Sequence, residues 1–248
     1  MARHSHFANI KRQKALTDGV RGKAFTMHAR LIAIAARAGG DPDMNSNLRA
    51  AIDRAKEDNV PNANIERAIK KGTGEDKEGA AFEEATYEGF GPEGCAILID
   101  TVTDNTNRAF ANLRTALTKN GGNIGSSGSV SWKFEKKAFF RVNTGGKTGD
   151  DIELELIDAG ADDLAEADEA FEVYAPVEQL GKVRKALEDK GFKVEKAELL
   201  WKPKDIVMIH DLETARKILA LIDVLEADED VSKVTTNVDF DDSIAAQI

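Results

Sequence analysis

The chain has 248 residues, 42 % of them apolar, and a formal net charge of −10 at neutral pH. This length indicates two or three domains with ordinary buried cores. One cysteine, Cys95, excludes an internal disulfide and is typical of a reducing compartment. The sequence has neither a signal-peptide pattern nor an apolar run of the roughly 18 residues that span a bilayer. We therefore expect a cytoplasmic protein without a membrane partner.

Positive charge is concentrated near the N-terminus. Residues 1–40 contain eight lysines and arginines and one acidic residue, Asp18, so the rest of the chain is strongly acidic. Such asymmetry indicates one end that faces nucleic acid. The alternative is a basic face that is only solvated, which is the usual state of a charge run.

A basic arm and three helices are expected in residues 1–78. Apolar residues are sparse up to residue 16, and then Phe25, Leu31 and Ile32 recur at helical spacing. The expected helices run over 18–38, over 45 or 46 to 58, and over 62–72. Short links between them predict a small three-helix bundle, and glycines in 72–79 predict a linker.

From residue 82 the pattern alternates between strands and helices. Strands are expected at 82–90, 95–102, 130–134, 138–142, 164–167, 171–174, 193–200, 206–209 and 232–238. Helices are expected at 105–120, 150–159, 177–190 and 212–226. The order over 138–200 is β-α-β-β-α-β, the ferredoxin-like arrangement.

The segment after residue 203 is too small to bury a core alone. We therefore expect residues 80–134 and 204–240 to form one discontinuous α/β domain, with 135–203 inserted as a ferredoxin-like domain. Three consecutive domains are the alternative. The expected class is α+β, with an N-terminal three-helix bundle and two ferredoxin-like α/β domains, one inserted in the other.

A line of cations is the main candidate binding feature. Lys23, Arg30 and Arg37 are seven residues apart, so they lie nearly in line along the first helix. Such a line can follow a phosphate backbone, with affinity from counterion release. The basic residues ahead of it lie on an arm that can fold on binding. The candidate nucleic-acid-binding residues are Arg3, His4, Lys11, Arg12, Lys14, Arg21, Lys23, Arg30, Arg37, Lys70 and Lys71.

The other motifs in the sequence give little support for a functional site. The second and third helices resemble a helix-turn-helix only weakly, because the cations of the third helix lie away from its N-terminal end. Segment 145–148 has Arg141 where a phosphate-binding loop needs glycine, and 122–128 has the wrong spacing for a dinucleotide loop. His4 and His6 supply two metal ligands at most. We expect no catalytic residue, metal or cofactor.

Several longer tracts together carry a family resemblance. They are residues 4–11, 21–25, 35–40, 48–52, 64–74, 87–92 and 121–125. In this order they resemble the YebC/PmpR family, whose mitochondrial relative is the translational activator of cytochrome c oxidase subunit I. The resemblance covers essentially the whole chain, although Arg3, His6 and Phe7 stand where the family typically has Gly, Lys and Trp.

The resemblance implies a helical domain followed by two α/β domains, and no catalytic activity. It implies a DNA-binding transcriptional regulator, the usual description of the family. A ribosome-associated translation factor that contacts ribosomal or transfer RNA is the alternative. Phosphate contacts serve both hypotheses equally, because they position a protein without specifying sequence. An enzyme or ligand sensor is a third hypothesis that no residue supports. The sequence does not reveal the oligomeric state.

Overall fold

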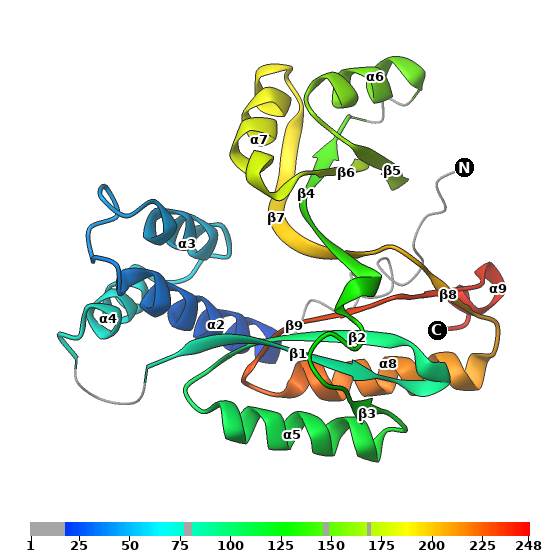
Figure 1. Ribbon diagram of the computed structural model, residues 1–248. Helices are drawn as coiled ribbons and strands as arrows, with labels where there is room; N and C mark the ends of the chain where they lie inside the picture. The colour runs from blue at the N-terminus through cyan, green and yellow to red at the C-terminus, as the bar shows by residue number, and fades with distance from the viewer. Residues whose placement is uncertain (1–17, 77–80, 146–148, 168–169) are drawn as a thin grey trace.

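The computed structural model describes residues 18–76, 81–145, 149–167 and 170–248. They form three packed units, which we call the helical, central and inserted units (Figure 1). The helical unit lies at the left of the figure, and the inserted unit stands above the central one. No helix in these residues is long and apolar enough to cross a membrane.

The helical unit contains three helices around a small apolar core. They are α2 (Asp18–Ala36), α3 (Ser46–Glu57) and α4 (Asn62–Thr73). Ile32 and Leu48 are fully buried in this core. Asn45 begins α3, since its side-chain oxygen accepts from the Leu48 N–H at 3.1 Å, and its Nδ2 donates to the Ala35 and Gly39 carbonyls at 2.8 Å each. One buried amide therefore joins the end of α2 to the start of α3.

Gly72 allows α4 to lie against α2. A Cβ at this position would be 2.3 Å from the Ala33 carbonyl oxygen and 2.6 Å from the Ala36 Cβ. Only a residue without a side chain permits backbones to approach so closely.

The central unit is a four-stranded antiparallel sheet with α5 (Thr106–Lys119) and α8 (Leu212–Ala227) on one face (Figure 1). The strand order is β3-β1-β2-β9. The strands are β1 (Glu83–Phe90), β2 (Ala96–Thr103), β3 (Asn123–Ile124) and β9 (Val231–Thr236). β8 (Val207–Ile209) and β10 (Val238–Phe240) form a parallel pair, and α9 (Asp242–Ala245) follows. Since β2 pairs with β9, segments far apart in sequence share one sheet.

The inserted unit has the ferredoxin-like strand order. Its elements are β4 (Phe134–Asn143), α6 (Asp150–Asp158), β5 (Asp163–Ala167), β6 (Ala170–Ala175), α7 (Leu180–Asp189) and β7 (Lys193–Pro203). The sheet order is β5-β6-β4-β7 with every neighbouring pair antiparallel. Phe140, Phe171 and Leu156 are fully buried in its core. This is the topology that the β-α-β-β-α-β order predicts.

The α+β class is confirmed, and these pairings favour the expected domain division, which we keep as a proposal. Three expected elements are corrected. Residues 130–134 are not a strand, because Ser131–Lys133 form a 3₁₀ turn and β4 begins at Phe134. Val177–Gln179 is a 3₁₀ turn ahead of α7. The last expected strand is broken at Asn237, whose buried side chain accepts from the Ala96 N–H at 2.8 Å, so the chain leaves one sheet for the other.

We expect Gly72→Ala to lower the stability of the helical unit by about 1–3 kcal/mol, because the added methyl group would push α2 and α4 apart. Gly22→Ala is the matched control in α2, since its Cβ would meet nothing within 4 Å. That control should stabilise the helix by about 0.5–1 kcal/mol. Thermal unfolding followed by circular dichroism measures both, and equal melting temperatures would contradict the close approach.

Candidate nucleic-acid interface

The three cations predicted in line along α2 point at the central unit. The Lys23 ammonium donates to the Glu226 carbonyl at the end of α8. The Arg37 guanidinium donates to the Phe82 carbonyl just before β1. Arg30, between them, contacts the loop that enters β9.

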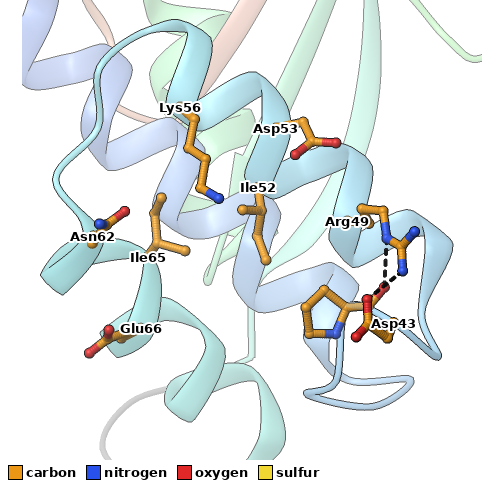
Figure 2. Close-up of a pocket in the computed structure, with 9 residues that line it drawn as sticks. Asp43, Arg49, Ile52, Asp53, Lys56, Asn62, Ile65 and Glu66 are labelled. Carbon is orange, nitrogen blue, oxygen red and sulfur yellow. Dashed lines mark hydrogen bonds and ion pairs between the residues drawn. The ribbon is translucent and has the colours of Figure 1, made fainter.

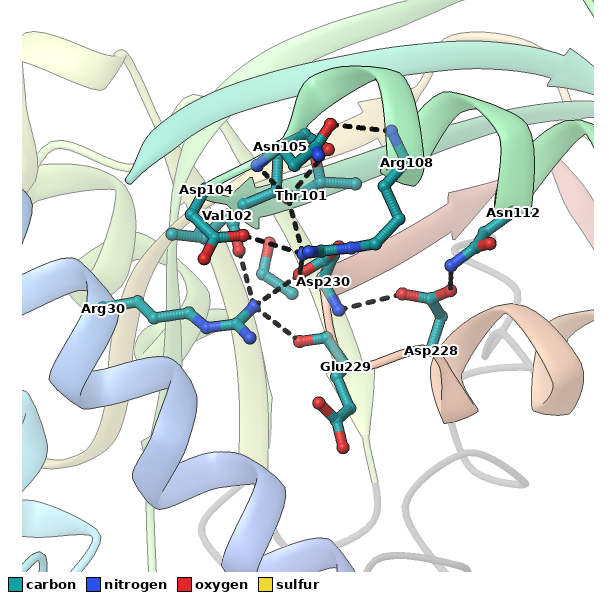
Figure 3. Close-up of polar contacts among 12 residues, drawn as sticks. Arg30, Thr101, Val102, Asp104, Asn105, Arg108, Asn112, Asp228, Glu229 and Asp230 are labelled. Atoms are coloured by element: carbon teal, nitrogen blue, oxygen red, sulfur yellow. Dashed lines mark hydrogen bonds and ion pairs between the residues drawn. The ribbon is translucent and has the colours of Figure 1, made fainter. Parts of the chain in front are cut away.

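Arg30 and Asp230 form the centre of this contact (Figure 3). The Arg30 Nη1 donates to Asp230 Oδ1 at 2.9 Å and to the Val102 and Glu229 carbonyls at 2.7 and 2.8 Å. The exposed fraction of the side chain is 12 % for Arg30 and 4 % for Asp230. Screening by salt is weak for a pair so little exposed.

A second arginine completes the cluster around Asp230. Arg108 of α5 donates to Asp230 Oδ2 at 2.9 Å and to Asp104 at 2.8 Å. Burial opposes the charge on Asp230, but the hydrogen bonds from Arg108 and Thr103 and the two arginine charges outweigh it and hold the pKa of this carboxyl below its ordinary value of 3.8. The carboxylate therefore stays ionised and ties α2 to α5.

Phe82 forms a second connection between the units. The Arg30 guanidinium carbon lies 5.4 Å from the centre of its ring, and the Lys71 ammonium lies 4.4 Å from it. Cations at these distances are attracted to an aromatic face. Lys71, which is half-buried, therefore also contacts the central unit.

These contacts engage the line of cations along α2 within the protein. Arg30 has three internal acceptors, and Lys23 and Arg37 each have one. Burial lowers the pKa of Lys23 despite the acidic residues around it. The structure does bring Lys23, Arg30, Arg37 and Lys71 together, but along the contact between two units.

The other predicted residues lie elsewhere. Arg3, His4, Lys11, Arg12 and Lys14 lie outside the described residues, and of Arg21 only the backbone in α2 is described. Lys70 is exposed on α4, as is Arg67 one turn before it. Within the described ranges, no carboxylate forms an ion pair with Lys70 or Arg67.

A groove of about 450 Å³ lies between α3 and α4 (Figure 2). Its polar lining mixes both signs of charge. The side chains are Pro42, Asp43, Arg49, Ile52, Asp53, Lys56, Asn62, Ile65 and Glu66. Arg49 already pairs with Asp43 at 2.7 Å. Three carboxylates and two cations line this groove, so it does not favour binding of a polyanion. The helix-turn-helix interpretation of α3 and α4 therefore stays weak.

The glycine-rich loop before β4 binds a carboxylate of the protein itself. The N–H groups of Gly128, Val130 and Ser131 donate to the Glu88 side chain at 2.7, 2.6 and 2.8 Å. Burial opposes the charge on Glu88, but these hydrogen bonds outweigh it and lower the pKa of the carboxyl. N–H groups arranged in this way bind anions, and here the bound anion is the Glu88 carboxylate.

Cys95 is buried, and His28 and His210 each hydrogen-bond a carboxylate of the protein. Burial raises the pKa of the Cys95 thiol to about 11, so it is a weak nucleophile. His28 bonds Asp58 at 2.6 Å and His210 bonds Asp241 at 3.1 Å. In the part of the chain that the structure describes, no three His, Cys, Asp or Glu side chains are grouped to hold a metal ion.

Asp230 and Phe82 are not predicted from the sequence. Asp230 is the last residue of an acidic run, 228–230, that resembles any solvated surface segment. Its partner Arg30 is 200 residues away in sequence, and no local pattern carries such a pairing. The one available signal was the surplus of cations on α2, which needed acceptors of some kind.

We expect Asp230→Asn to lower the free energy of unfolding by about 3 kcal/mol, because Arg30 would lose its buried counter-charge. Asp104→Asn is the matched control. It removes the more exposed partner of Arg108 and should cost less than about 1 kcal/mol. Urea unfolding compares the two, and an equal loss in both variants would refute the central role of Asp230.

The same pair predicts a dependence on pH. The folded-state pKa of Asp230 lies below the unfolded value, so its contribution is fully present above pH 3.8 and is lost as the pH falls through the lowered pKa. The stability difference between wild type and Asp230→Asn should therefore shrink under acid conditions. A difference that stayed constant on acidification would contradict the ionised pair.

Comparisons with known proteins agree over the whole chain. The family model described as "TACO1/YebC protein N-terminal domain" matches residues 5–75, and "TACO1/YebC second and third domain" matches residues 82–238. A relative from Thermobifida fusca is 46 % identical over 249 residues and covers 100 % of both chains. One from Trichormus variabilis is 47 % identical over 251 residues, covering 99 % of this chain and 98 % of its own. Both are named "Probable transcriptional regulatory protein".

A solved structure shows the same fold. The crystal structure of a conserved hypothetical protein from Aquifex aeolicus superposes with a TM-score of 0.82 at 41 % identity, covering 92 % of this chain and 94 % of that one. The resemblance found in the sequence tracts is thereby confirmed. Two family models that together match nearly the full length, and relatives that align from end to end, show that this chain belongs to the TACO1/YebC family.

Proposed function

We propose that this protein is a non-catalytic, cytoplasmic, nucleic-acid-binding regulator of gene expression, and that it binds DNA in the control of transcription. The charge distribution carries the proposal: residues 1–40 hold eight basic residues and one acidic one in a chain of net charge −10. The names of the relatives from Thermobifida fusca and Trichormus variabilis support the transcriptional role.

The contacts of α2 divide the candidate residues into two groups. Lys23, Arg30 and Arg37 have internal acceptors, so in our proposal they orient the helical unit. The proposed phosphate contacts come from the arm and the start of α2, together with the far end of α4. These residues are Arg3, His4, Lys11, Arg12, Lys14, Arg21 and Lys70. Lys71 also belongs to this group, although its ammonium lies over the Phe82 ring.

Arg67, which is not among the cations predicted from the sequence, joins this proposed surface. It is exposed three residues before Lys70, so the two side chains share one face of α4. Phosphate groups attract such cations through counterion release.

The alternative is a ribosome-associated factor that contacts RNA. The acidic remainder of the chain favours it, because a protein of net charge −10 is repelled by a polyanion everywhere except at its basic end. Such a charge distribution suits a ribosomal pocket that only the basic end enters. The phosphate contacts would be the same in both cases.

We expect replacement of Arg3, Lys11, Arg12 and Lys14 by alanine to weaken nucleic-acid binding and flatten its salt dependence. Each lost phosphate contact should reduce the slope of log K against log salt by about 0.9 on duplex DNA. The matched control replaces four exposed cations of α5 and α7, which are Arg114, Lys119, Lys182 and Lys185. Fluorescence anisotropy at several salt concentrations measures the slopes, and equal slopes in both variants would count against the basic end.

Crosslinking in cells separates the two kinds of nucleic acid. We expect the wild-type protein to recover promoter DNA, and the arm variant to lose it. Recovery of ribosomal or transfer RNA alone would replace the transcriptional proposal with the translational one. Recovery of neither, together with no binding in vitro, would refute nucleic-acid binding itself.

A further inference from the structure

Trp132 is one of two tryptophans in the chain, and 62 % of its surface is exposed. It lies in the 3₁₀ turn Ser131–Lys133, where the chain passes from the central to the inserted unit. A tryptophan exposed to this degree gains little from burial, since most of its apolar area stays in water. The packing of the fold therefore does not account for it.

The turn holds Trp132 in a fixed orientation. Val130 before it and Phe134 after it are buried in one apolar cluster. The Glu88 carboxylate accepts from the N–H groups of Val130 and Ser131. The indole Nε1 donates to the Ser129 carbonyl at 3.1 Å, which fixes the plane of the ring. A ring held in this way loses little entropy on binding.

Two lysines contact Trp132, and a third lies on β4, the strand that follows it. The Lys133 ammonium lies 4.7 Å from the centre of the indole and pairs with Asp205 at 2.8 Å. The Lys204 ammonium donates to the Trp132 carbonyl at 3.1 Å. Lys136 lies over the second tryptophan, Trp201, at 5.6 Å. In the described part of the chain, neither Lys136 nor Lys204 forms an ion pair with a carboxylate.

We propose that Trp132, with Lys136 and Lys204, binds single-stranded nucleic acid, with an unpaired base stacked on the indole and neighbouring phosphates on the two ammonium groups. This rests on the proposed function and adds a second contact site to it. A rigid exposed indole beside cations suits a base, because every base has a π-face and its strand carries phosphates. A duplex offers no free base face to the ring, so the site selects unpaired strands.

Intrinsic fluorescence provides the test in the full-length protein. In the variant Trp201→Phe the only indole is Trp132. Titration with a single strand of about 16 nucleotides, oligo-dT or oligo-U, should quench it. A duplex of equal length should not. Quenching by an acidic peptide but by neither single strand would show a protein-binding surface and overturn the proposal.

Affinity provides the second measurement. We expect Trp132→Ala to weaken single-strand binding about 5- to 150-fold, the effect of one lost stacked base, and to leave the salt slope unchanged. Lys136→Ala with Lys204→Ala should instead flatten that slope. Phe110→Ala is the control for an exposed aromatic residue elsewhere, and it should bind like the wild type.

The outcomes separate this site from the proposed function. If the wild type binds single strands and Trp132→Ala binds them with the same affinity, the tryptophan site is refuted. The proposed binding by the basic end is then unaffected. No binding of any strand by the wild type would refute both. Loss of self-association in Trp132→Ala, seen by sedimentation, with unchanged strand binding would make the surface an interface between copies of the chain.

Discussion

The arrangement of the units depends on one nearly buried carboxylate, Asp230. It accepts hydrogen bonds from Arg30 of α2 and Arg108 of α5, and its exposed fraction is 4 %. A carboxylate at this depth is costly without partners and stable with them. The loop before β9 must therefore meet α2 as well as α5, which fixes how the helical unit lies on the central one and turns the cations of α2 inward.

This constraint changes what the basic residues can do. The sequence indicates one place for phosphate, the line of cations on α2, and the structure shows a second set of anion-binding donors in the glycine-rich loop before β4. At each place a carboxylate of the chain itself is bound: Asp230 pairs with Arg30, the middle cation of the line, and Glu88 accepts from the N–H groups of the loop. The chemistry that predicts a phosphate site is the same chemistry that holds an internal carboxylate, because both anions use N–H donors and cations. Solvent exposure distinguishes the two cases, and sequence does not report it.

Local periodicity was enough to predict most elements, but not the contacts between them. The apolar spacing of α2 and the β-α-β-β-α-β order of the inserted unit are short-range patterns, and both led to the observed elements. Residues 130–134 were mistaken for a strand because Glu88, more than forty positions earlier in the chain, bends them into a turn. The break at Asn237 depends on Ala96, and the burial of Arg30 depends on Asp230. These three failures follow from partners distant in sequence, whereas the 3₁₀ turn Val177–Gln179 is a local departure.

Charged contacts and one small apolar cluster link the three units. The apolar cores of the three units are separate, apart from a small cluster at the connection between the central and inserted units. Its buried residues are Ala96, Leu98, Val130 and Phe134, with Phe90 and Trp201 packed against them. The ion pairs Arg30–Asp230, Lys233–Glu198 and Arg184–Glu57 link the units in turn. Arg67 and Lys70 lie on α4 of the helical unit, and Trp132 lies in the turn between the other two units. If a strand contacts both, as we propose, Asp230 influences the path of that strand by holding α2 against the central unit.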